Sequence, residues 1–507
     1  MLRRLMKKRK AQTSTFTKHD YNDFLRYKIG ITELNILPNS VEELKVILER
    51  VFDNSDDFSV RSMELPSGQK VFFYYVAGLI DADRMEEAVI RPIVNHGEKN
   101  PHEKLTHVGS LNYEVNYITV DSWPDLIQLC LQGHVICQIS DQKPVVLSLE
   151  KLEKRSLSEP TTEQQVYGPK IGFIEDSRTN VGLVRRIIVD PRLKVKQFHV
   201  GSLTHTAVAV MYLEEYVDNE VLEEVLKKIP QYENDFLISS YALERSLIEH
   251  PNSLFPQFQK SERPDQVAYA LSQGKIVIAI NNSTFSLILP ATMWSFYERS
   301  DDNDEGSPWH VFFIRMLRIS SLIIATTFPA LYVALVAFHP EMVPTTLALT
   351  MAESRNNIPF PAAIEAFIMM FALDVLVEAS IRLPSFIGPT IGIVGGLVIG
   401  QSAVEAGIIS STMVIVIAFT AIAAFTSPSW ELASSWRVIR YLFLLAASLL
   451  GMYGLTLAIC VLAMHLCALT SMNKPFLSPM APFNFREFIN MIVRIKKKNS
   501  GVGEGRK

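Results

Sequence analysis

The C-terminal part of this sequence contains uncharged apolar runs that are too long for the core of a soluble domain. The run from Ile319 to Phe338 has 20 residues without an acidic or basic side chain, between Arg318 and His339. At ~1.5 Å per residue, a helix of this length matches the thickness of a bilayer core. Three further uncharged runs cover residues 383–404, 406–430 and 441–464. The sequence therefore predicts a multi-span α-helical membrane domain over residues 311–475.

The residues before Arg318 have a different composition, with charges throughout, which is typical of soluble domains. No basic excess favours nucleic-acid binding, and no Gly-Lys-Ser/Thr loop is present to cradle a nucleotide. The four cysteines form neither a zinc motif nor a disulfide framework. The basic residues at the N-terminus are not followed by an apolar segment, so they do not form a signal peptide. We therefore expect a basic N-terminal tail over residues 1–35 and a basic C-terminal tail over residues 476–507.

The soluble part contains a weak internal duplication. The segment from Tyr75 to Asp81 and its acidic continuation resemble the segment from Tyr212 to Asp218, 137 positions later. A second pair of similar segments begins at Gly133 and at Gly274. Each copy reads as a buried strand, a helix capped by an aspartate, and a later β-hairpin. A chance similarity between common strand–helix patterns is the alternative. We predict an α+β protein with two related soluble α/β lobes, at residues 36–155 and 156–310.

Charged residues interrupt one apolar segment of the predicted membrane domain. They are Glu365, Asp374, Glu378 and Arg382. The last three are spaced i, i+4 and i+8, which places them along one face of a helix. A charge in the middle of a bilayer costs several kcal/mol unless it faces a partner or water. The segment is therefore either an ion path or subunit-contact face, or an amphipathic helix that lies at the membrane interface.

The next apolar run carries a glycine seam. Four glycines recur every fourth residue, at Gly388, Gly392, Gly396 and Gly400. Such a seam allows close contact between helix backbones, so we expect a helix-packing role.

The orientation of the spans is ambiguous. Basic residues before the first span, before the last span and in the C-terminal tail all favour the cytoplasmic side. That arrangement requires an even number of crossings, whereas five apolar segments are visible. Either the acidic segment is interfacial, or the region Tyr441–Asn473 folds back.

No catalytic constellation, metal-ligand cluster or cofactor motif is found, so we expect a protein that is not an enzyme. The charged block Glu262, Arg263 and Asp265 surrounds Pro264 in the second lobe. It is either a salt-bridged helix start or a contact surface of the soluble lobe.

A set of motifs in a fixed order resembles the GerA-type spore germination A subunits. In the second lobe these motifs are Ser177-Arg-Thr-Asn180, Leu183-Val-Arg-Arg186, Phe255-Pro256 and Glu262-Arg-Pro-Asp265. The membrane domain adds Pro329-Ala-Leu-Tyr332, Pro359-Phe-Pro361, Glu378-Ala-Ser-Ile-Arg-Leu-Pro384 and the glycines from Gly388 to Gly400. The resemblance covers residues 170–470 well and the first lobe more loosely.

The resemblance implies one subunit of a three-component nutrient-germinant receptor in the spore inner membrane. Its partners would be a transporter-like B subunit and a lipoprotein C subunit, and its lobes would face the spore core. The A subunit of that family would oligomerise, as a ring for example, and contribute an ion-conducting path. A stand-alone secondary transporter and a membrane-anchored scaffold are the rival interpretations. Neither a cofactor nor a nucleic-acid partner is implied.

Overall fold

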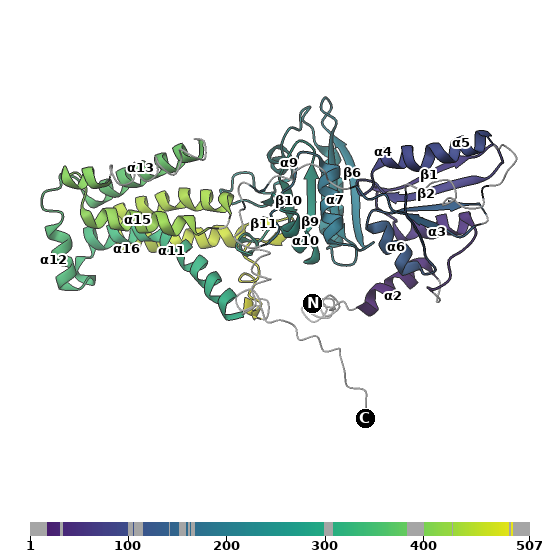
Figure 1. Ribbon diagram of the computed structural model, residues 1–507. Helices are drawn as coiled ribbons and strands as arrows, with labels where there is room; N and C mark the ends of the chain where they lie inside the picture. Colours follow the sequence, from purple (N-terminus) through teal and green to yellow (C-terminus); the bar gives the residue numbers. More distant parts are fainter. Residues whose placement is uncertain are drawn as a thin grey trace. The chain divides into compact units, whose positions relative to one another are not determined.

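The chain divides into two compact units, which Figure 1 shows as ribbons in a computed structural model. Unit 1 comprises Met1–Leu247 and Lys260–Ile288, and unit 2 comprises Ile248–Gln259 and Leu289–Lys507. The segment Ile248–Gln259 was expected within lobe 2, but it belongs to unit 2. The residues on both sides of it belong to lobe 2, which is part of unit 1. The residues that the structure describes are 18–30, 34–99, 105, 115–140, 142–151, 159–160, 163, 168–298, 308–382, 400–427, 429–485 and 488–489.

Lobe 1 of unit 1 is a five-stranded antiparallel sheet between two layers of helices. Its strand order is β1-β2-β4-β5-β3. Strand β2 shows why the sheet is covered on both faces: Val71 and Phe73 belong to one core cluster, and Tyr74 and Val76 to another. Because side chains alternate along a strand, a run without polar residues must be buried on both sides. The elements are α2 (Lys18–Ile29), α3 (Val41–Val51), β1 (Phe58–Glu64), β2 (Lys70–Val76), α4 (Ala82–Met85), η2 (Glu86–Ile90), α5 (Arg91–Lys99), β3 (Tyr117–Thr119), α6 (Trp123–Leu131), β4 (Val135–Ile139) and β5 (Val145–Leu147).

Lobe 2 repeats this topology, with the strand order β6-β7-β9-β10-β8. The order of first, second, fourth, fifth and third strand is the same in both lobes, which supports the duplication predicted from sequence. Asp81 and Asp218 cap corresponding helices, and each accepts a hydrogen bond from a backbone N–H of the first turn. The elements are α7 (Ser177–Ile187), β6 (Leu193–Val200), β7 (Thr206–Leu213), α8 (Asn219–Lys228), η4 (Ile229–Gln231), α9 (Ser240–Leu247), β8 (Gln259–Ser261), α10 (Pro264–Ser272), β9 (Ile276–Ile280) and β10 (Ser286–Leu289).

Part of the expected N-terminal tail belongs to lobe 1. Helix α2 places Phe24, Leu25 and Ile29 in the same core cluster as Trp123. These three side chains are at most 5% exposed. The boundary of lobe 1 therefore lies before residue 36, because the apolar face of this helix is buried against the sheet layer.

The two lobes are joined by a buried ion pair and by a second pair that is partly exposed. Arg185 of α7 donates from Nε and Nη2 to the two carboxylate oxygens of Asp57, over 2.6 and 2.9 Å. The two side chains are 1% and 2% exposed. Nearby, Lys194 of β6 contacts Asp53 at 2.9 Å, and burial lowers the pKa of Lys194. The lobes also approach closely at Gly182, where a Cβ would lie 3.1 Å from the carbonyl oxygen of Gly78.

Unit 2 is mainly helical and contains the apolar runs. Its helices are α11 (Pro308–Phe338), α12 (Thr345–Glu353), α13 (Ala362–Arg382), α15 (Ser411–Phe425) and α16 (Trp430–Ala468), followed by the short strands β11 (Thr470–Ser471) and β12 (Lys474–Pro475). Among the described residues, two helices are long and apolar enough to cross a membrane. These are Trp309–Phe338 and Trp430–Ala468, in which an 18-residue stretch has a mean hydropathy of 2.0 and 2.1, respectively. The larger number of spans that the sequence suggests stays a prediction.

Helix α16 is a helical hairpin rather than one straight helix. Gly451 has φ 59° and ψ −137°, which is not helical. The ring of Phe255 lies 5.2 Å from Trp436 in the first arm and 6.2 Å from His465 in the second. In a straight helix those two positions would be about 43 Å apart. The chain therefore reverses at Gly451, which agrees with the expectation that Tyr441–Asn473 can fold back.

Two features make glycine necessary at this reversal. The positive φ of Gly451 is unfavourable for a side chain with a Cβ, by about 1–2 kcal/mol. In addition, a Cβ at Gly451 would lie 2.8 Å from the side chain of Phe338 at the end of α11. One turn later, a Cβ at Gly454 would overlap the carbonyl oxygen of Ala446.

We predict that Gly451→Val destabilises the protein by roughly 2–5 kcal/mol, from the backbone strain together with overpacking. The measurement is the thermal midpoint of the purified full chain in detergent, together with its abundance in the membrane fraction. Gly400→Ala is the matched control, because a Cβ there would make an ordinary 3.7 Å contact with Val414. Equal midpoints for the two variants would contradict the requirement for glycine at the reversal.

Candidate functional site

Asp374, in the middle of α13, is held by cations of α16. Its carboxylate accepts hydrogen bonds from Arg440 Nη2 at 3.0 and 3.1 Å and from the Tyr441 hydroxyl at 2.6 Å. Arg437 Nε lies 3.6 Å from the same carboxylate. The Arg440 side chain is 4% exposed and that of Asp374 is 17% exposed. The counter-charge of Asp374 therefore comes from another helix.

Glu365, at the start of α13, occupies a second buried polar site. It is fully buried, and its carboxylate accepts hydrogen bonds from the backbone N–H and the hydroxyl of Ser410, both at 3.0 Å. Ser410 is the N-cap of α15, so the carboxylate lies at the positive end of that helix. Arg355 completes the site at 3.2 Å. Glu365 thus joins α13 to the start of α15 by hydrogen bonds and to the segment after α12 by an ion pair.

Glu378 lies one turn after Asp374, on the outward face of α13. It is exposed, as are Ile364, Ile368, Phe371 and Val375 on the same face. These five positions are separated alternately by four and three residues, the spacing of a helix-packing seam. The described helix ends at Arg382, whose side chain lies outside the described residues. Of the acidic residues predicted in this helix, Glu378 is thus on the surface, while Asp374 and Glu365 hold other helices.

Most of the glycine seam lies outside the described residues, namely Gly388, Gly392 and Gly396. Gly400 is buried and helical, and a Cβ added there would lie 3.7 Å from the side chain of Val414. That distance is ordinary van der Waals contact, so the space at this position does not demand glycine. The packing role of the seam stays a prediction.

The charged block of lobe 2 forms the start of α10. Arg263 is the N-cap residue, Pro264 is the first helical residue, and Arg263 Nε donates to Asp265 at 3.1 Å. Glu262 and Arg263 are 6% and 2% exposed, and the backbone carbonyl of Glu262 accepts a hydrogen bond from Phe173 N. The local geometry is that of a salt-bridged helix start. A contact between this block and another subunit stays a prediction.

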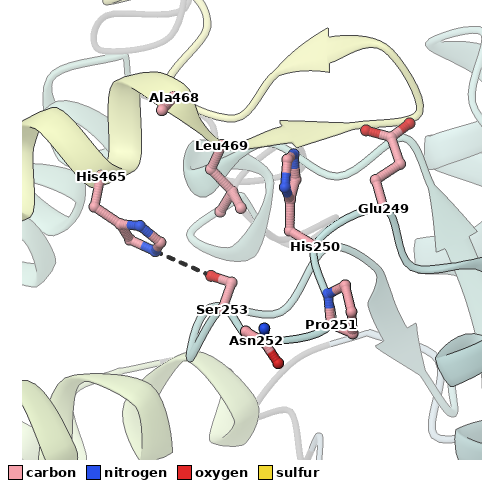
Figure 2. Close-up of a pocket in the computed structure, with 8 residues that line it drawn as sticks. All are labelled: Glu249, His250, Pro251, Asn252, Ser253, His465, Ala468 and Leu469. Carbon is pink, nitrogen blue, oxygen red and sulfur yellow. Dashed lines mark hydrogen bonds between the residues drawn. The ribbon is translucent and has the colours of Figure 1, made fainter.

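A pocket of about 280 Å³ lies beside the last turn of α16 (Figure 2). Residues 249–253 line one side, and His465, Ala468 and Leu469 line the other. His465 Nε2 and the Ser253 hydroxyl are 3.2 Å apart across it. The described residues contain no group of three or more His, Cys, Asp or Glu side chains that could hold a metal ion. The pocket lies at the junction between the loop and the end of α16.

Sequence reasoning missed the cationic partners of the acidic residues. Arg437 and Arg440 are among the basic residues before the last span, which predict only its orientation, and no pattern points to Arg355. Their spacing from Asp374 and Glu365 carries no periodic signal, because the members of each pair do not lie on the same helix. The available clue was that Arg440 directly precedes an apolar run, which is a costly position for an uncompensated charge.

Comparison with known proteins identifies the family. The model for the family described as "Bacillus/Clostridium GerA spore germination protein" matches residues 46–501. Spore germination protein KA of Bacillus subtilis is 35% identical over 452 residues, which cover 87% of this chain and 82% of that protein. Spore germination protein GerLA of Bacillus cereus is 33% identical over 470 residues, which cover 92% of this chain and 94% of that protein.

A solved structure also matches the chain. It is the N-terminal domain of the A subunit of the Bacillus megaterium spore germinant receptor GerK3, with 23% identity and a TM-score of 0.40. The match covers 52% of this chain and 98% of that domain. The family assignment rests on the sequence matches, which extend through both units: this chain belongs to the GerA family of spore germination proteins.

Proposed function

We propose that this chain is the A subunit of a nutrient-germinant receptor of bacterial spores. In this role it converts nutrient binding into cation release from the spore core. Its partners are a transporter-like B subunit, a lipoprotein C subunit and further copies of itself. It lies in the spore inner membrane as a multi-pass protein, with the soluble lobes on the core side. The family membership and the two long apolar helices support this assignment.

The observation that carries the ion-conducting part of the proposal is the outward face of α13. Among the side chains of this face that the structure describes, Glu378 is the charged one, and the residues have the spacing of a helix-packing seam. If the same face of each copy lines the centre of a ring, the Glu378 carboxylates lie at one level. A ring of carboxylates attracts cations and is a common element of cation-selective pores.

The buried charges of unit 2 argue against a membrane-anchored scaffold, and the position of the duplication argues against a stand-alone transporter. A membrane-anchored scaffold needs no ionised side chains between its helices, yet Asp374 and Glu365 are both paired with arginines there. Such pairs are costly to bury and favour a defined helix arrangement. A stand-alone secondary transporter would be favoured by an inverted repeat in the membrane domain, and the sequence duplication lies instead in the soluble lobes.

We predict that Glu378→Gln slows nutrient-triggered cation release about fivefold without changing receptor abundance. Removing one charge about 4 Å from an aqueous path changes the energy of a passing cation by about 1 kcal/mol, which corresponds to this factor. The measurement is the cation released from variant spores after nutrient addition, normalised to receptor level by immunoblot.

Glu353→Gln is the matched control, because Glu353 is an exposed carboxylate at the end of α12 in the same unit. It should leave the rate unchanged. Wild-type release by Glu378→Gln spores at wild-type abundance would exclude a conducting role for Glu378. Reduced abundance would instead assign this carboxylate a structural role.

A further inference from the structure

The loop Ile248–Gln259, here called the coupling loop, joins the two units covalently at both of its ends. It connects α9 to β8 in lobe 2, yet it packs within unit 2. The loop contains Phe255 and Pro256, a motif to which the proposed function assigns no task. Its contacts within each unit indicate what it can do.

The two ends of the coupling loop are tied together in unit 1. Lys260, just after the loop, forms a 2.7 Å ion pair with Glu244 of α9, whose side chain is 6% exposed. The Lys260 ammonium also lies 5.4 Å from the ring centre of Tyr241 in the same helix. Because of these contacts, a displacement of α9 moves both ends of the loop together.

The coupling loop is also braced internally by Gln257. This side chain is 2% exposed, and its carbonyl oxygen accepts hydrogen bonds from the backbone N–H groups of Glu249 and His250 at 3.1 and 3.2 Å. Its amide nitrogen donates to the carbonyl oxygen of His250 at 2.8 Å. One buried side chain thus joins the incoming and outgoing limbs, as in compact loops whose ends lie close together. The loop can therefore move as one body.

Within unit 2, the coupling loop contacts both arms of the α16 hairpin. Phe255 is 2% exposed, and its ring packs edge-on against Trp436 of the first arm and beside His465 of the second. On the first arm, the Ser435 hydroxyl donates to the carbonyl oxygen of Leu254 at 2.5 Å. On the second arm, His465 is hydrogen-bonded to Ser253 (Figure 2). A displaced loop would therefore act on both arms at once.

The chain beyond the hairpin is held by the same loop. The Thr470 hydroxyl donates to Glu249 at 2.6 Å and lies 3.0 Å from His250 Nε2. The Ser471 hydroxyl donates to the carbonyl oxygen of Gln257 at 2.6 Å. The coupling loop thus contacts three segments at the open end of the hairpin: the first arm, the second arm and strand β11.

We propose that the coupling loop is the element that transmits movement of lobe 2 to the α16 hairpin, with Phe255 as its anchor between the arms. This inference rests on the proposed receptor function. The ends of the coupling loop are joined to α9, its two limbs are hydrogen-bonded to each other, and it contacts both arms of the hairpin. A contiguous set of contacts of this kind can transmit a displacement. The coupling loop then controls the separation of the two arms of α16, and this separation determines the response to nutrient.

The first test replaces the anchor. Phe255→Leu keeps an apolar side chain but removes the ring that contacts both arms. We expect cation release triggered by a mixture of amino acids and sugars to slow about tenfold per receptor, within the usual range of coupling between sites. Phe296→Leu is the matched control, because Phe296 is equally buried in the same core cluster but lies outside the loop. It should release cations at the wild-type rate.

The second test loosens the connection without touching the contacts of the loop with α16. Insertion of Gly-Ser-Gly after Ile248 lengthens the link to α9, and the same insertion after the exposed residue Glu233 is its control. We expect slow release only from the first insertion, at equal abundance of both proteins. This variant decides the question if Phe255→Leu lowers the abundance of the receptor.

The outcomes separate the two proposals. Wild-type release per receptor by the Ile248 insertion would overturn the transmitting role of the loop. A wild-type response from spores that lack this chain altogether would overturn the proposed receptor function instead. Slow release by both loop variants, with normal release by both controls, is the result that the coupling loop predicts.

Discussion

Replacing Asp374 with alanine is expected to lower the amount of this protein in the membrane fraction at least tenfold. The substitution leaves Arg440, whose side chain is 4% exposed, without the carboxylate that contacts it at 3.0 Å. Arg437 also loses its partner at 3.6 Å. Breaking a buried pair by removing one member costs about 3–5 kcal/mol, and losses of about 1–2 kcal/mol already change abundance severalfold.

The double variant Asp374→Leu with Arg440→Met tests whether the loss of stability comes from the unpaired charge of Arg440 or from the change in side-chain packing. Replacing both members of a buried pair by apolar residues is often neutral. We therefore expect the double variant to recover much of the abundance that the single variant loses. Immunoblots of membrane fractions measure both effects. Wild-type abundance of Asp374→Ala would show that the pair does not stabilise the helices, and it would return Asp374 to consideration as a residue of the ion path.

The second large effect is expected at the contact between the two soluble lobes. Arg185→Ala leaves the carboxylate of Asp57 buried at 2% exposure, where it still accepts a hydrogen bond from the Ser55 hydroxyl. We expect a loss of about 3–5 kcal/mol, which lowers the thermal midpoint by roughly 10 °C for a unit of this size. Arg185→Lys should recover only part of this loss, because an ammonium cannot reproduce the two-pronged contact.

Thermal unfolding of the purified full chain, monitored together with limited proteolysis, measures this effect. Arg61→Ala is the matched control, because the pair between Arg61 and Glu86 is 52% and 42% exposed. Exposed pairs contribute about 0–1 kcal/mol, so the control should unfold close to the wild-type temperature. Equal midpoints for Arg185→Ala and Arg61→Ala would show that the buried pair does not hold the lobes together.

The duplicated lobes were predictable from the sequence because their signals are local. A strand buried on both faces, such as β2, must be a continuous apolar run, and an N-cap such as Asp81 or Asp218 acts within one turn of its helix. The run Ile319–Phe338 was predictable for the same reason, and it lies within α11. The start of lobe 1 was less predictable, because α2 is largely polar and only its contact with the sheet layer buries Phe24 and Leu25.

Patterns along the chain were sufficient to predict the two related α/β lobes, the long apolar helices and the family, whereas the multi-span arrangement stays a prediction. The tertiary structure alone decided which charges meet. Asp374 pairs with Arg440 66 positions away, and helical spacing reports only neighbours on the same helix. The structure also shows at which glycine the chain of α16 reverses. The sequence pattern treats Gly451 and Gly454 alike, and only the positive φ of Gly451 distinguishes them. The contact of Phe255 with both hairpin arms could not be predicted for the same reason, because it joins segments that are far apart in the sequence.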